Sequence, residues 1–364
     1  MISRRFGPLS STPVRQLART LAALLLVLAG PLTTPAALGE QETLIEGRWT
    51  IDFDDRHASN QTFQLSMERR SDHSHWQSSS SFRFQDFRGL SRPAGAAEAP
   101  IQFELVRDAG TFAFQGHADS RGGSGRFRFT PSAEFQSAWT AAGRSPLSRD
   151  RLYSMAVHDV SRAFIRDLAS LGYPDVSADR LITLRIHGAT ADFIRELQSL
   201  GYTRMPIDQI VTFRIHGVTA EGIRELQAMG YTRLPADELV SMRIHGATPE
   251  FARSMAELGY ERASIENLVS FRIHGVSPEY VRAFRDLGYK HLPADGLVSM
   301  RIHGVSPEFV KDLQGLGYRD VPIDELVSMR IHGVSVEFVR DAQAHDRNVS
   351  IDELVSMRIH GKRW

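Results

Sequence analysis

The sequence predicts an α+β protein with a small antiparallel β domain followed by a solenoid of helical hairpins. Residues 46–131 alternate apolar and polar side chains with a period of two, and from residue 158 onward one histidine recurs about every 29 residues. The chain has 364 residues and is 42% apolar, which is enough to build a packed core. In chain order, we expect a signal peptide at 1–39, the β domain at 40–131, a linker at 132–150 and the repeats at 151–364.

The first 39 residues are typical of a secretory signal peptide. Four arginines precede the apolar run from Leu21 to Gly30, and small residues follow at Ala37 and Gly39. The run is too short to span a bilayer comfortably, so we expect membrane attachment only through an uncleaved signal segment. The predicted location is therefore outside the cytoplasm, either periplasmic or secreted.

Composition excludes several classes of function. Lys plus Arg and Asp plus Glu number 43 each, so no global positive field is present to bind nucleic acid. The chain has no cysteine, which removes disulfides, thiolate zinc sites and cysteine nucleophiles. No catalytic triad, acid pair or nucleophile stands in a recognisable context. We therefore predict no enzyme and no cofactor, and we assign no catalytic or metal-binding residue.

The β domain shows its strands as alternating segments such as "TFQLSME", "IQFELVR" and "GRFRFTP". Gly122 and Gly123 precede the last of these and Gly125 begins it, and we expect these glycines to adopt the positive backbone angles of a tight hairpin turn. The segment 130–150 is rich in Ala, Ser and Pro, which is why it is interpreted as a linker.

The repeats have a clear second half and an ambiguous first half. In the second half, Ser277 is placed to cap a helix that begins at Pro278 and ends at Gly288. The first half, "LVSMRIH", could be the strand of a leucine-rich repeat. However, Ser or Pro followed by an acid, as in Ser350 and Asp352, is typical of a helix start. This favours helical hairpins, with the β/α solenoid as the alternative.

The recurring arginines and histidines are interpreted as structural residues at helix ends. Equivalent residues of a helical stack lie roughly 8–10 Å apart, whereas two imidazoles on one zinc ion lie within about 4 Å of each other. A common role as pH-sensitive groups is left open. The residues of this ladder are Arg185, His187, Arg214, His216, Arg243, His245, Arg272, His274, Arg301, His303, Arg330, His332, Arg358 and His360.

The copies at both ends of the array depart from the pattern. The first copy, which contains His158, has Asp159 in place of the glycine, and the last complete copy loses its Leu-Gly-Tyr to "AHDRN". Polar terminal copies are what a stack needs where its last faces meet water. We therefore expect both ends to be exposed.

The units "LVSMRIHGVSPEFV", together with "FELVRDAGTFAFQG" and "GSGRFRFTP" before them, carry a family resemblance. Roughly residues 100–361 resemble the extracytoplasmic tails of bacterial membrane zinc peptidases of the β-lactam-sensor type, and related exported proteins that stand alone. The peptidase motif His-Glu-x-x-His is absent, so the resemblance does not imply peptidase activity. It implies a sensor or partner-binding role in a bacterial envelope.

The leading hypothesis is a non-enzymatic interaction or scaffold module with a protein or peptide partner. Residues that differ between copies on the second helices are the expected partner-binding face, namely Gln198, Gln227, Glu257, Arg285 and Gln314. The alternative is ligand or metal binding by the β domain, centred on His73, His75 and His117.

Overall fold

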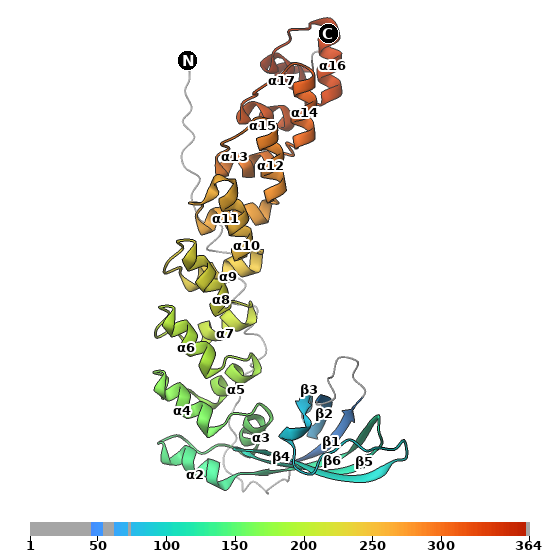
Figure 1. Ribbon diagram of the computed structural model, residues 1–364, viewed down its shortest axis with the longest axis vertical. Coiled ribbons are helices and arrows are strands. Elements are labelled where there is room, and N and C mark those ends of the chain that lie inside the picture. The colour runs from blue at the N-terminus through green and yellow to red at the C-terminus, as the bar shows by residue number, and fades with distance from the viewer. Residues whose placement is uncertain (1–44, 54–61, 72–73, 362–364) are drawn as a thin grey trace. The chain divides into compact units, whose positions relative to one another are not determined.

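The computed structural model describes residues 45–53, 62–71 and 74–361. The expected signal peptide at 1–39 lies outside the described residues. The chain divides into two compact units, one ending at Arg195 and the other beginning at Glu196, and each is described by itself. The first unit holds the sheet and the first helices, and the second holds the later repeats (Figure 1).

The β domain is a six-stranded antiparallel sheet, which confirms the prediction from the alternating sequence. Its strand order is β3-β2-β1-β6-β5-β4. The strands are β1 (Ile45–Asp52), β2 (Thr62–Ser71), β3 (Ser74–Arg83), β4 (Ala99–Arg107), β5 (Gly110–Ala118) and β6 (Gly122–Pro131), with a 3-10 turn η1 (Phe84–Asp86) after β3.

One face of this sheet carries an aromatic core. Because side chains alternate along a strand, Trp49 of β1, Phe103 of β4 and Phe114 of β5 lie on the same side. The rings of Phe103 and Phe114 stack at 4.6 Å, and Trp49 meets them edge-on at 5.1 and 6.3 Å. Trp49 Nε1 also donates to the backbone oxygens of Gln115 (3.2 Å) and Arg126 (3.1 Å), so the indole is held across β5 and β6.

The three glycines expected to form the turn lie instead within strand β6, so that expectation is wrong. Gly122, Gly123 and Gly125 are not among the glycines with positive φ. The turn is made just before them, where Asp119 Oδ1 accepts hydrogen bonds of 2.7 and 3.0 Å from two backbone N–H groups. The glycines serve strand pairing, because a Cβ on Gly125 would lie 2.0 Å from the backbone oxygen of Gln115.

The segment interpreted as a linker contains helix α2 (Ala133–Ala141). The hydroxyl of Ser132 accepts the N–H of Phe135 at 3.1 Å, which caps the helix, and Phe135 and Trp139 are buried. The indole N–H of Trp139 donates to the backbone oxygen of Ser145 at 2.9 Å. The chain after α2 therefore folds back onto the helix.

The first repeat copy packs on the sheet, so the expectation that its face is open to water is wrong. Its first helix, α3 (Arg149–Val157), places Tyr153 at 5.4–6.3 Å from three phenylalanine rings of β5 and β6, and Tyr153 is only 3% exposed. Asp159 lies 3.3 Å from Arg107 of β4 as an ion pair. The aspartate that replaces glycine in this copy therefore contacts the β domain.

Both halves of every repeat are helices, which confirms the helical hairpins and contradicts the leucine-rich-repeat alternative. The first helices after α3 are α5 (Ala178–Ile186), α7 (Ile207–Ile215), α9 (Ala236–His245), α11 (Ile265–His274), α13 (Ala294–Ile302), α15 (Ile323–Ile331) and α17 (Ile351–His360). The second helices are α4 (Arg162–Ser170), α6 (Ala191–Ser199), α8 (Ala220–Ala228), α10 (Pro249–Met255), α12 (Pro278–Asp286), α14 (Pro307–Gly315) and α16 (Val336–His345). A π-turn, η2 (Ala256–Tyr260), follows α10.

The caps explain why the helices begin where they do. The hydroxyl of Ser277 accepts the N–H of Tyr280 at 3.2 Å, with Pro278 at the first helical position of α12. Ser350 and Glu353 form a reciprocal capping box at the start of α17. These boundaries follow from short-range chemistry, which is why the sequence predicts them well.

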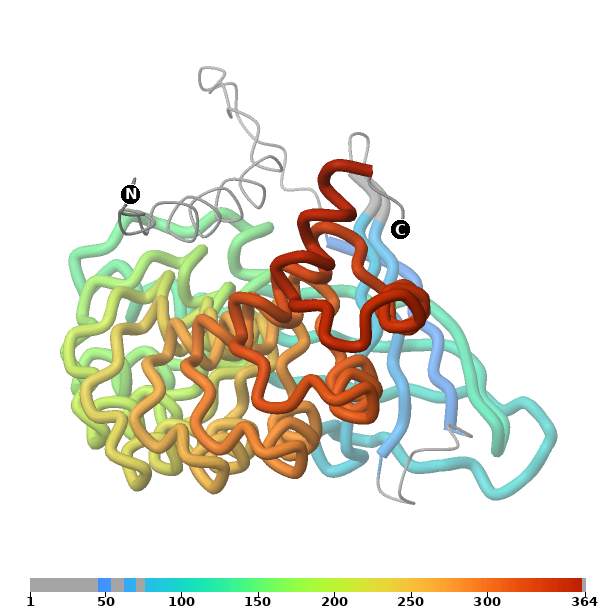
Figure 2. The backbone as a smooth tube through the Cα atoms, turned by 90° about the horizontal axis from the view of Figure 1, so that it is seen from above, coloured from blue at the N-terminus to red at the C-terminus, as the bar shows by residue number. Residues whose placement is uncertain are grey.

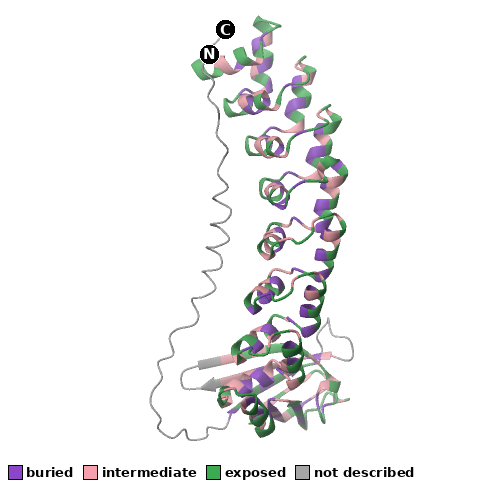
Figure 3. Cartoon of the chain, turned by 90° about the vertical axis from the view of Figure 1, so that its left-hand side faces the viewer, coloured by how far each residue is buried: buried purple, intermediate pink, exposed green. Residues whose placement is uncertain are grey.

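In the second unit, first helices pack against first helices and second against second. Helix α11 contacts α9 and α13, while α12 contacts α10 and α14 (Figures 1 and 2). Side chains such as Phe284, Leu297 and Leu313 are fully buried between these helices. Figure 3 shows buried segments, in purple, on successive helices. Each repeat thus buries its apolar side on its neighbours.

Candidate functional site in the repeats

Each first helix from α5 to α17 ends in the recurring residues Arg-Ile-His-Gly, and the glycine of this segment stops the helix. From Gly188 to Gly333 this glycine has φ between 66° and 73°, a left-handed conformation that glycine adopts at little cost. The next residue then bonds back to the helix, as in Val276, whose N–H donates to the oxygen of Phe271 at 2.8 Å. The buried Val276 leads the chain into the second helix.

The arginine of the segment joins its repeat to the preceding one. For five of these arginines, the guanidinium lies over an aromatic ring on the second helix of the preceding repeat, at 4.7–5.5 Å from the ring centroid, where a cation is attracted to the ring face. The pairs are Arg185 with Phe164, Arg272 with Phe251, Arg301 with Tyr280, Arg330 with Phe309 and Arg358 with Phe338.

The same guanidinium also reaches the end of the preceding first helix. Arg185 Nε donates to the backbone oxygen of His158 at 3.0 Å, and Arg358 Nε donates to that of Gly333 at 2.8 Å. The glycine leaves room for this approach, because a Cβ on Gly275 would lie 2.9 Å from Arg301 Nη2. Arginine and glycine therefore act together across the boundary between repeats.

The isoleucine of the segment points away from the core. The seven isoleucines are 44–56% exposed, namely Ile186, Ile215, Ile244, Ile273, Ile302, Ile331 and Ile359. Six of them lie in the second unit on first helices that pack side by side, so neighbouring members are roughly 8–10 Å apart. We call these six, from Ile215 to Ile359, the isoleucine row. Packing within the chain does not account for an apolar residue here.

The histidines of the segment stand beside the isoleucine row. His245, His274, His303, His332 and His360 are exposed, and His216 is half-buried. Among the described residues, no group of three or more His, Asp or Glu side chains is placed to hold a metal ion. In the first unit His187 is exposed, whereas His158 is half-buried beside Arg185.

The half-buried His158 makes the first unit sensitive to acid. Burial, and then the positive charge of Arg185, lower the pKa of His158 below its usual 6.5. The unfolded chain therefore binds more protons between this lowered pKa and 6.5, so the histidine's contribution to stability is complete above pH 6.5 and is lost as the pH falls. We expect the melting temperature to fall more steeply between pH 7 and pH 5 in the wild type than in His158→Gln. Superimposable profiles would contradict this.

Two further ladders of hydrogen bonds join consecutive repeats, and the first of them was not predicted from the sequence. After five of the second helices, from α6 to α14, a tyrosine hydroxyl donates to a backbone oxygen 31 or 32 residues later, at 2.6–2.9 Å. The donors are Tyr202, Tyr231, Tyr260, Tyr289 and Tyr318. The tyrosine that follows the helix-ending glycine in successive copies is the signal in the sequence that could have indicated this ladder.

The second ladder uses residues of the expected partner-binding face. Gln227 Nε2 donates to the oxygen of Leu200 at 3.1 Å, and Gln314 Nε2 donates to that of Leu287 at 2.8 Å. These two side chains are half-buried and join repeats, as does Gln343, which was not singled out. Of the other residues expected on this face, Glu257 and Arg285 are exposed and Gln198 is half-buried.

His75 and His117 of the β domain do not lie on adjacent strands. His73 lies outside the described residues, and only the backbone of His75 is described. His75 belongs to β3 and His117 to β5, which stand four places apart in the sheet and are thus roughly 19 Å apart along it. These two histidines are too distant in the sheet to share a metal ion as neighbours.

Comparisons with models of known protein families find no match, and a comparison with curated proteins finds none either. The resemblance of residues 100–361 to the tails of sensor peptidases therefore stays a prediction. In the part of the chain that the structure describes, no helix is both long and apolar enough to cross a membrane.

Proposed function

We propose that this protein is an exported, non-enzymatic interaction module of a bacterial envelope, and that its repeats bind a protein partner along the isoleucine row. The observation that carries the proposal is the exposure of the same apolar residue at the same place in successive repeats. Apolar side chains gathered on an exposed surface are typical of protein interaction sites.

The other residues of the Arg-Ile-His-Gly segment support the assignment of the isoleucine to partner binding. Within Arg-Ile-His-Gly, the arginine and the glycine make contacts between repeats, so their recurrence has a structural cause. The isoleucine is about half exposed and has no such cause. Side chains such as His274 beside Ile273 add a hydrogen-bonding group that a partner's carboxylate or carbonyl could meet. The matching partner surface is therefore apolar with acceptor groups between its apolar contacts.

The proposed location rests on the sequence of residues 1–39 and on the resemblance to envelope proteins. The balanced charge argues against nucleic acid as the partner. The isoleucine row replaces the second-helix residues as the leading contact surface, because Gln227 and Gln314 are already engaged between repeats.

The test is photo-crosslinking of the full-length protein in its native cells. A benzophenone amino acid at position 302 should give one crosslinked product that mass spectrometry identifies, whereas the same group at Lys311, an exposed residue of α14, should not. With the identified partner purified, Ile273→Asp together with Ile302→Asp should raise the Kd at least about tenfold. Burying one isoleucine is worth about 1.5–3 kcal/mol, and 1.4 kcal/mol is tenfold.

The double variant also needs a stability control. Because both isoleucines are about half exposed, its melting temperature should stay close to that of the wild type. Equal crosslinking from positions 302 and 311, or a partner Kd unchanged in the double variant, would overturn the proposal.

A further inference from the structure

One repeat lacks the aromatic ring that the others place between consecutive repeats. The third residue after the capping Ser or Thr of each second helix is aromatic in six copies, namely Phe164, Phe193, Phe251, Tyr280, Phe309 and Phe338. In the remaining copy this residue is Gly222 of α8. The next arginine along, Arg243 of α9, therefore has no ring beneath it at this position.

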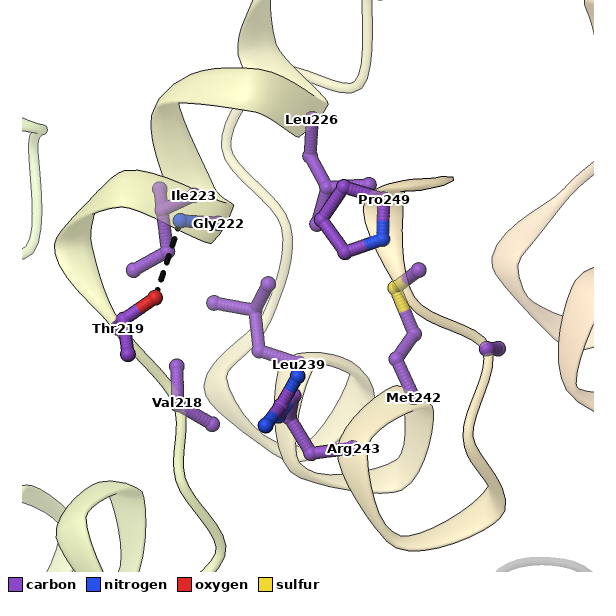
Figure 4. A pocket seen from close by; sticks show the side chains of 10 residues that line it. Val218, Thr219, Gly222, Ile223, Leu226, Leu239, Met242, Arg243 and Pro249 are labelled. Atoms are coloured by element: carbon purple, nitrogen blue, oxygen red, sulfur yellow. Dashed lines mark hydrogen bonds between the residues drawn. The ribbon is translucent and has the colours of Figure 1, made fainter. Parts of the chain in front are cut away.

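The helix at Gly222 begins like the others. The hydroxyl of Thr219 accepts the N–H of Gly222 at 3.1 Å, the same cap that starts the other second helices (Figure 4). A Cβ on Gly222 would meet no atom closer than Thr219 Oγ1 at 3.3 Å and Pro249 Cγ at 3.7 Å. The backbone is thus in place to carry a side chain, and only the side chain is missing.

An open apolar cleft occupies the position of the missing ring. It is shallow, with a cavity volume of about 30 Å³, and about 300 Å³ of empty space lies in and above it when the part open to solvent is counted. Leu226 of α8, Leu239 and Met242 of α9 and Pro249 of α10 line it, with Arg243 beside them (Figure 4). These side chains come from two consecutive repeats, as do the contacts of the aromatic rings elsewhere in the array.

We propose that this cleft binds an aromatic side chain, phenylalanine or tyrosine, presented by the partner polypeptide. This inference rests on the proposed function, because the bound partner supplies the ring. The sister repeats show what fits, because rings such as Phe309 lie in the equivalent place beneath Arg330 and are 7% exposed. A ring that enters from the side open to solvent would cover this apolar lining, and burying apolar surface is favourable.

The lining favours an aromatic over an aliphatic side chain. The guanidinium of Arg243 can lie over a ring face, and the thioether of Met242 can contact a ring edge, and both contacts favour an aromatic group. Apolar side chains make up most of the remaining wall, which suits a side chain within a peptide better than the charged termini of a free amino acid.

The test uses N-acetyl-phenylalaninamide as the probe and the full chain labelled with ¹³C at its methionine methyl groups. The Met242 methyl resonance, assigned with Met242→Leu, should shift saturably, and the probe should bind at least about threefold more tightly than N-acetyl-leucinamide. Gly222→Phe should abolish the shift and raise the melting temperature, because its own ring fills the cleft. Free phenylalanine should bind more weakly than the capped probe.

A second pair of variants keeps the test decisive if Gly222→Phe fails to fold. Arg243→Gln should remove the preference for the aromatic probe, and Phe309→Gly should create a second binding position that is reported by Met329. No saturable shift at Met242, equal binding of the leucine probe, or an unchanged shift in Gly222→Phe would each overturn the inference. Probe binding without any partner crosslink would count against the proposed function and leave the cleft standing.

Discussion

Replacing Phe284 by alanine is expected to destabilise the middle of the repeat array by about 3–5 kcal/mol, the usual cost of removing a buried phenylalanine ring. Phe284 of α12 is fully buried, and its ring meets Tyr280 at 4.8 Å and Tyr289 at 6.0 Å between centroids. Its loss would leave a cavity at the boundary between repeats and would loosen the tyrosine whose hydroxyl donates to Val321.

The loss of stability in Phe284→Ala should be confined to the neighbouring repeats, so it must be measured at individual helices. In a stacked array each repeat contacts only its neighbours, so a single free energy of unfolding does not describe the chain. Hydrogen exchange should show faster opening of α10 to α14, with α17 least affected. The matched control is Ile273→Ala, because Ile273 is 51% exposed and its truncation should change opening free energies by only about 0.5 kcal/mol or less. Equal effects of the two variants would contradict this account of the core.

The helices were predictable because their signals are local. Ser277, Pro278 and Glu279 stand within one turn, and the hydrogen bond from Tyr280 N to the Ser277 hydroxyl needs no tertiary context. The strands of the β domain were predictable for the same reason, since alternation is a property of one segment. The contacts between repeats were not predictable in this way, because they join residues on different helices. Arg301 of α13, for example, lies over the ring of Tyr280 of α12, 21 residues earlier in the chain.

The outward direction of the isoleucine row could have been derived once the first half of each repeat was taken as a helix. At about 100° per residue, Ile302 stands about 200° from Met300 and about 140° from Leu297, both fully buried. As a strand, "LVSMRIH" would place Val, Met and Ile on one face, so the strand alternative gives no sign that the isoleucine is exposed. The cleft at Gly222 also had a signal in the sequence, because a glycine stands there at a position that is aromatic in the six other copies. Its open space, however, depends on packing that no sequence shows.

The β domain offers the second large effect: Gly125→Val is expected to lower its free energy of unfolding by about 3 kcal/mol or more, because overpacking and lost hydrogen bonds add. Gly125 of β6 faces Gly116 of β5, and a Cβ on Gly125 would lie 2.0 Å from the oxygen of Gln115. The strands must separate to admit a side chain. That movement would break the hydrogen bonds that Trp49 Nε1 donates to the backbone oxygens of both strands.

The destabilisation caused by Gly125→Val should extend to α3, and hydrogen exchange can detect it there. Tyr153 of α3 packs on phenylalanine rings of β5 and β6, so hydrogen exchange should quicken in both strands and in α3 together. Ser124→Val is the matched control: Ser124 is the preceding residue of β6, and its exposed side chain lies on the opposite face, where valine favours a strand. A Gly125→Val protein as stable as Ser124→Val would show that β5 and β6 can part without loss. The close glycine pairing would then be incidental to how the sheet holds its aromatic core.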